Sequence, residues 1–223
     1  MSIQKSEIKL DVNGKPVNAY LASPSDGGPG VLVLPSWWGL KDFFKQICDQ
    51  LAEHGYTALA PDYYNGRVAK TIDEAKALSG EAESDLDALG ALIKAAKDHL
   101  VSLRPGKPIG ILGASMGTDW AIITAAKETD VAATVLFYGG WSLDFSQMKS
   151  KVLEHYAETD EWFPFDRAQE MEQDMKAAGV DVTLHVYPGT VHWFIESDRP
   201  EYDAASASLA WDRTFEFLKQ NLA

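Results

Sequence analysis

Residues 108–117 have the sequence PIGILGASMG, in which an apolar run leads into the pattern G-x-S-x-G. The run is typical of a buried strand, and the residues after Ser115 have the spacing of a helix. A turn from strand to helix within one residue needs a strained backbone at the serine, and glycines beside it leave room because they carry no Cβ. The stretch therefore predicts a hydroxyl held out at the carboxyl end of a strand. The alternative is that Ser115 merely caps the helix.

Short apolar runs and helical stretches alternate on both sides of this segment. The runs lie at about 30–34, 56–60, 108–113, 132–138, 151–157 and 181–187, and helices are expected at about 41–54, 71–100, 115–128, 165–178 and 201–222. Strands that are apolar on both faces and alternate with helices predict a mostly parallel sheet covered on both sides. Two further strands, at about 3–10 and 16–22, are joined by Asn13-Gly14, a strong hairpin signal. The sequence thus predicts an eight-stranded α/β fold in a single domain, residues 1–223.

Composition and charge limit the class of protein. The chain has 223 residues, with 20 basic and 33 acidic side chains and a formal net charge of −13. Because an acidic surface repels phosphate backbones, we expect no nucleic-acid partner. The N-terminus has no apolar leader pattern and no apolar run is long enough to span a bilayer, so we expect a cytoplasmic protein with no membrane partner. The one cysteine, Cys48, excludes an internal disulfide and a multi-cysteine zinc site, and is expected to be a small buried residue.

A histidine is needed to take the proton of a serine nucleophile, and a carboxylate is needed to orient that histidine. After a G-x-S-x-G serine, the acid and then the histidine follow in the chain. Of the five histidines, two precede Ser115 and two lie in expected strands, whereas His192 follows the last expected strand. Pro188 and Gly189 are expected to break that strand, which places His192 in a loop at the same end of the sheet. We therefore interpret His192 as the base.

Three carboxylates compete for the role of the acid, because the strand at 151–157 runs into Glu158, Asp160 and Glu161. Asp160 lies a few residues beyond the strand end, where a loop can turn toward His192. We interpret Asp160 as the orienting acid, with Glu158 and Glu161 as alternatives. A solvated acidic loop is the other interpretation of this segment.

The chain resembles the dienelactone hydrolase family of α/β-hydrolases over nearly its whole length. The resemblance is carried by residues 30–40 and 51–62, by the segment around Ser115, and by the loops that hold Asp160 and His192. It implies an α/β-hydrolase fold without a large lid domain. Two backbone N–H groups must hold the oxyanion. One should belong to Met116, the residue after the nucleophile, and the resemblance assigns the other to Trp37.

Three features differ from what is common in that family. The nucleophile position holds Ser115 instead of cysteine, and Ser36 stands where the family enzyme has a glutamate linked to the resting state of that cysteine. The family enzyme also grips a substrate carboxylate with arginines, but four residues after His192 this chain has Glu196. Arg67 could supply the other arginine or be a solvated loop charge. These differences argue against dienelactone itself as the substrate.

Aromatic side chains gather on the loops expected at the catalytic end of the sheet. An apolar wall favours a neutral ester or lactone over a peptide, and the short segments between strands predict an open site for small substrates. The expected pocket consists of Ser36, Trp38, Tyr64, Arg67, Trp141, Trp162 and Trp193.

The sequence therefore predicts a serine hydrolase that cleaves small carboxylic esters or lactones through an acyl-enzyme, as a monomer or homodimer, without a metal or cofactor. A peptidase or acyltransferase on the same fold is one alternative. A non-catalytic ligand-binding module is another.

Overall fold

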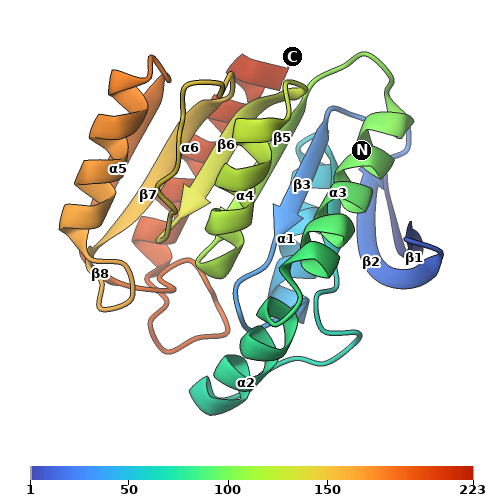
Figure 1. Ribbon diagram of the computed structural model, residues 1–223, viewed down its shortest axis with the longest axis horizontal. Helices are drawn as coiled ribbons and strands as arrows, with labels where there is room; N and C mark the ends of the chain where they lie inside the picture. Colours follow the sequence, from blue (N-terminus) through green and yellow to red (C-terminus); the bar gives the residue numbers. More distant parts are fainter. Residues whose placement is uncertain (1, 223) are drawn as a thin grey trace. The chain divides into compact units, whose positions relative to one another are not determined.

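The computed structural model describes residues 2–222, which form eight strands and six helices. They fall into two compact units that divide between Ile109 and Gly110, within strand β5 (Ile109–Ala114). Figure 1 labels the elements, and each unit is described by itself. The sequence-based expectation of one domain stays a prediction.

The strands of the first unit combine a hairpin with a parallel pair. They are β1 (Ile3–Val12), β2 (Lys15–Pro24), β3 (Gly30–Leu34) and β4 (Thr57–Pro61), in the sheet order β1-β2-β4-β3. β1 pairs antiparallel with β2, as Asn13-Gly14 predicted, and both turn residues have positive φ. β2 and β4 are antiparallel, whereas β3 and β4 are parallel. Every residue of β3 and β4 is buried, which agrees with their unbroken apolar runs.

Helices cover both faces of these strands. α1 (Asp42–Glu53) packs on β2 and β4, and α3 (Leu86–Leu103) packs on β1, β3 and β4. In Figure 1, α3 crosses in front of the strands and α1 lies behind them. α1 is followed by Gly55 at φ +94°, the left-handed conformation that commonly follows a helix. The buried face of α1 includes Cys48, as expected, and burial raises the pKa of its thiol.

The single helix expected over residues 71–100 is wrong, because two helices occupy this segment. α2 (Ile72–Glu83) ends at Ser84, and α3 begins after Asp85, whose carboxylate accepts the backbone N–H of Ala88 at 2.9 Å. This N-cap stabilises the start of a second helix, and the non-helical backbone of Asp85, at φ −134° and ψ 78°, separates it from the first. The expected capping interaction at Thr71 is present, since its hydroxyl accepts the N–H of Glu74 at 3.2 Å.

The strands of the second unit follow β5 in the order β5-β6-β7-β8, with β6 (Val131–Phe137), β7 (Lys151–Thr159) and β8 (Val182–Val191). β6, β7 and β8 are parallel to one another. The expectation that Pro188 and Gly189 break the last strand is wrong, because β8 continues to Val191. A proline is tolerated there because β8 ends the sheet order, and the N–H of Gly189 donates to the carboxylate of Glu158 at 2.8 Å.

Three helices belong to the second unit: α4 (Met116–Lys127), α5 (Phe165–Ala177) and α6 (Ala204–Leu222). α4 packs on β6 and α5 on β7 and β8, while α6 lies behind the strands in Figure 1. α6 begins three residues later than expected because Asp203 accepts the N–H of Ser206 at 2.8 Å and so starts the helix. Among the described residues, no helix combines the length and hydrophobicity that a membrane crossing requires.

Candidate active site

Ser115 forms the sharp turn between β5 and α4 that the sequence predicted. Its backbone lies at φ +50° and ψ −121°, a conformation that residues with a side chain rarely adopt. The N–H of Ser115 donates to the carbonyl of Phe137 at 3.0 Å, so the end of β6 holds the turn. The serine side chain makes no capping hydrogen bond to α4. Ser115 occupies the N-cap position of α4, but its hydroxyl does not cap the helix and contacts His192 instead.

Two glycines make room for this turn. A Cβ at Gly113 would lie 2.5 Å from the carbonyl oxygen of Gly117 and 2.8 Å from Cα of Thr118. A Cβ at Gly139 would lie 3.0 Å from the carbonyl oxygen of Ser115. Because both approaches involve backbone atoms that cannot yield easily, these positions exclude larger residues.

His192 contacts both Ser115, which lies 77 positions earlier in the chain, and Asp160, which lies 32 positions earlier. Its Nε2 lies 2.9 Å from Oγ of Ser115, and its Nδ1 lies 2.7 Å from Oδ2 of Asp160. The side chain of His192 is 5% exposed and that of Asp160 is fully buried, so water competes little for these hydrogen bonds. The structure therefore brings the three predicted catalytic residues together within the second unit.

Asp160 is held by its own loop as well as by His192. Its Oδ1 accepts the backbone N–H groups of Trp162 and Phe163, both at 2.9 Å. The competing Glu158 instead binds the N–H of Gly189, and Glu161 is exposed. Of the three candidate acids, Asp160 is the one that contacts His192.

Aromatic rings surround the imidazole of His192. The rings of Tyr138 and Trp193 each lie 4.8 Å from it between centroids, and that of Trp162 lies 6.5 Å away. Trp193 has φ +69°, and Arg199 stacks over its indole at 5.0 Å. These rings leave the imidazole little freedom to turn.

Sequence reasoning missed Tyr138, which it placed inside the strand at 132–138. The residue is fully buried, and its hydroxyl donates to Oε1 of Glu196 at 3.0 Å. Glu196, which stands four residues after His192 in place of the family's arginine, is also fully buried. The signal for Tyr138 was the pair Gly139-Gly140 after an apolar run, which marks a strand end beside a close contact.

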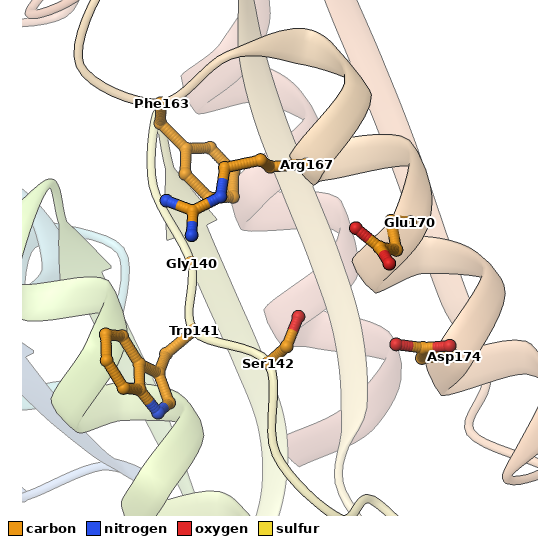
Figure 2. A pocket seen from close by; sticks show the side chains of 7 residues that line it. All are labelled: Gly140, Trp141, Ser142, Phe163, Arg167, Glu170 and Asp174. Carbon is orange, nitrogen blue, oxygen red and sulfur yellow. The ribbon is translucent and has the colours of Figure 1, made fainter.

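Two cavities lie near these loops. One of about 170 Å³ is lined by His192 together with Thr159, Glu161, Trp162, Val191, Trp193 and Glu201. The other, of about 230 Å³, lies between the loop after β6 and α5, and Figure 2 shows its lining residues. Of the expected pocket residues, Trp162 and Trp193 line the first cavity and Trp141 lines the second.

The other expected pocket residues lie in the first unit. Trp38 and Tyr64 are buried, and the hydroxyl of Ser36 is buried without a hydrogen-bond partner in the described part of the chain. Both terminal nitrogens of Arg67 donate to the carboxylate of Glu81, at 2.8 and 2.9 Å. Arg67 is thus engaged by an acid of its own unit. Trp37 follows β3 in this unit, while Met116 is the first residue of α4, and their pairing in an oxyanion hole stays a prediction.

A strand–serine–helix turn followed along the chain by an acid and a histidine defines the class of α/β-hydrolases. The model of the dienelactone hydrolase family matches residues 17–222, and the chain belongs to this family. By that membership it is a carboxylic-ester hydrolase. The expected α/β-hydrolase fold is confirmed, and no connection between elements of residues 2–222 forms a separate lid domain.

Relatives of similar length support this assignment. "Protein usf" of Aquifex pyrophilus is 34% identical, with 96% of this chain and 98% of the relative covered. A protein of Aquifex aeolicus named "Putative carboxymethylenebutenolidase" is 33% identical with the same coverage. The crystal structure of a "Putative Dienelactone Hydrolase" from Klebsiella pneumoniae is 25% identical, has a TM-score of 0.78, and covers 99% of this chain and 100% of its own.

Proposed function

We propose that the chain is a serine hydrolase that cleaves small carboxylic esters or lactones through an acyl-enzyme. The observation that carries this proposal is the pair of hydrogen bonds on opposite nitrogens of His192, 2.9 Å to Ser115 and 2.7 Å to Asp160. A base placed between a hydroxyl and a buried carboxylate can accept the serine proton and is stabilised when it becomes positively charged.

The proposed reaction has the following steps. Oγ of Ser115 attacks the ester carbonyl carbon as Nε2 of His192 takes the hydroxyl proton. The N–H groups of Met116 and Trp37 would donate hydrogen bonds to the oxyanion, and the positive end of the helix dipole, at the N-terminus of α4, would stabilise its charge. The tetrahedral adduct collapses as His192 returns the proton to the leaving alcohol. Water, activated by His192, then cleaves the acyl-enzyme and regenerates Ser115.

The size of the cavity beside His192 supports small substrates. Its volume of about 170 Å³ is below the roughly 300–1,000 Å³ of drug-sized ligand sites. The indole rings of Trp162 and Trp193 line it beside the imidazole of His192. An apolar niche of this size suits a short acyl or alcohol group. We expect a preference for short-chain, uncharged esters.

Fluorophosphonate labelling with peptide mapping tests the nucleophile. We expect the label on Ser115, no label in Ser115→Ala, and normal labelling in Ser102→Ala, whose exposed hydroxyl binds the carbonyl of His99 within α3. Labelling at another serine would overturn the site. A series of p-nitrophenyl esters tests the substrate class, where a preference for long acyl chains would contradict the proposal.

A further inference from the structure

Tyr138 adopts a strained backbone at the end of β6. Its φ of +43° is in the left-handed region, which a large aromatic residue rarely occupies. The N–H of Tyr138 donates to the carbonyl of His155 at 2.9 Å, and the side chain is fully buried. Such strain persists only where surrounding contacts fix the conformation, and it is concentrated at functional sites.

The side chain of Tyr138 makes two contacts on the base side of the site. Its ring lies 4.8 Å from the imidazole of His192 with a tilt of 57°, and its hydroxyl lies 3.0 Å from Oε1 of Glu196. Burial, and secondarily the charge and hydrogen bond of Glu196, raise the pKa of the Tyr138 phenol far above its usual value. The phenol therefore keeps its proton and donates a hydrogen bond to Glu196.

The hydrogen bond joins two loops that are 58 positions apart in the chain. On the Tyr138 side, the neighbouring Phe137 carbonyl accepts the N–H of Ser115, and Gly139 packs against the Ser115 backbone. On the other side, the N–H of Glu196 donates to the carbonyl of Trp193 at 2.8 Å, which closes a turn directly after His192. The hydrogen bond between Tyr138 and Glu196 thus connects the segment that holds Ser115 with the turn that follows His192.

We propose that Tyr138 and Glu196 are positioning residues that hold the imidazole of His192 at the distance and angle required by Ser115. The proposal rests on the function proposed above. The ring of Tyr138 limits rotation of the imidazole, and the hydrogen bond to Glu196 fixes the ring. A misplacement of about 1 Å in an active site can reduce the rate about 100-fold. Loss of the Tyr138–Glu196 hydrogen bond should therefore slow the chemical step and lower kcat.

The variant Tyr138→Phe tests the role of the Tyr138–Glu196 hydrogen bond, because it keeps the ring and removes only the hydroxyl. Tyr187→Phe is the matched control, since it removes a buried phenol hydroxyl that lies 2.7 Å from Nδ1 of His155, in a network that does not include His192. We expect Tyr138→Phe to lower kcat about 10-fold or more while KM changes less than twofold. The rate of fluorophosphonate labelling should fall in the same proportion.

In Tyr187→Phe we expect kcat within twofold of the wild-type value, although both variants should lose thermal stability. A kcat for Tyr138→Phe within twofold of wild type would overturn the proposal. An equal fall of kcat in the two variants would also overturn it, because that result would indicate a merely structural role.

Substitution of Glu196 provides a second test. Glu196→Gln keeps a carbonyl oxygen that can accept from Tyr138, whereas Glu196→Ala does not. We expect the Gln variant to retain at least several-fold more kcat than the Ala variant, and equal values would contradict the role of the acceptor. If Glu196→Ala does not fold, Tyr138→Phe decides the question. Failure of the wild-type chain to label at Ser115 would reject the proposed function itself, whereas normal labelling with an unaffected Tyr138→Phe would reject only the positioning role.

Discussion

Nδ1 of His192 lies 2.7 Å from Oδ2 of Asp160, while the other oxygen of that carboxylate accepts two backbone N–H groups. The acid therefore cannot rotate without losing a hydrogen bond to its own loop. This arrangement also sets the tautomer of the imidazole, because a carboxylate accepts from Nδ1–H and leaves Nε2 free to take the serine proton. The orientation of the base thus depends on the loop between β7 and α5.

Replacement of Asp160 by Asn should separate geometry from charge. The amide oxygen of Asn can still accept the loop N–H groups, but its NH₂ group faces Nδ1 of His192 and favours the wrong tautomer. We expect kcat to fall about 10³- to 10⁴-fold with little change in thermal stability. Hydrolysis of p-nitrophenyl acetate measures the effect. The exposed Asp26, changed to Asn, is the control, and a kcat for Asp160→Asn within tenfold of wild type would exclude Asp160 as the orienting acid.

Two glycine-to-alanine changes should act in opposite directions on the free energy of unfolding. Gly80 lies within α2 with open space around its Cβ position, so Gly80→Ala should stabilise the chain by up to about 1 kcal/mol. Gly113→Ala places a Cβ 2.5 Å from a backbone oxygen and should destabilise by about 1–3 kcal/mol or more, with a loss of activity. Urea denaturation checks both values. Equal stability of the two variants would show that the turn at Ser115 tolerates a Cβ at position 113.

Glu154 should make the stability of the folded chain depend on pH. The residue lies on β7, is fully buried, and neither carboxylate oxygen has a hydrogen-bond partner among the described residues. Burial, followed by the charge of Glu172, raises the pKa of Glu154 well above 4.5. The folded state therefore keeps a proton that the unfolded state releases. As pH rises from about 4.5 toward the raised pKa, Glu154 costs about 1.4 kcal/mol of stability for each pH unit.

The variant Glu154→Met should remove this dependence. We expect its advantage over wild type in the free energy of unfolding to grow between pH 5.5 and pH 7.5, by up to about 3 kcal/mol. Denaturant titrations at the two pH values give the measurement. Glu53→Met, on the exposed side of α1, controls for the loss of one carboxylate from an acidic chain. A difference between Glu154→Met and wild type that stays constant with pH would contradict the inference.

The break between α2 and α3 should depend on the cap at Asp85. Asp85→Ala removes the acceptor for the Ala88 N–H and should lower stability by about 0.5–2 kcal/mol. Asp87→Ala, in the first turn of α3, should cost less, because Asp87 does not cap the helix and contributes through the helix dipole. Thermal unfolding of the two variants compares them. A larger loss for Asp87→Ala would show that the cap does not define the start of α3.

The elements that the sequence predicted well are those determined by local pattern. The apolar runs became strands within a few residues of the expected bounds, and Ser115 has the strained backbone that its glycines indicated. The order serine, acid, histidine pointed to His192 and to three carboxylates, and the position of Asp160 beyond the strand end favoured it over Glu158 and Glu161. In the structure Asp160 lies 2.7 Å from His192, and their loops follow the neighbouring strands β7 and β8. Candidate site residues can be predicted from sequence where a reaction requires a few residue types in a fixed order along the chain.

The features that the sequence did not predict depend on contacts that no local pattern contains. The helix over residues 71–100 looked continuous until the Asp85 side chain was found to cap a second start. The strand β8 continues through Pro188 because Glu158, from another strand, satisfies the N–H of Gly189. The contact between Tyr138 and Glu196 spans 58 positions and joins two residue types with no typical spacing.

The burial of Cys48 has a practical consequence for studying this enzyme. Its thiol is fully enclosed on α1 and the chain has no second cysteine, so thiol-directed reagents should leave the native protein unmodified and active. A cysteine introduced at an exposed position, such as Trp141 beside the loop after β6, would then be the single reactive attachment point for a fluorophore or spin label. The label would report on the surroundings of that loop during turnover without prior removal of a natural thiol.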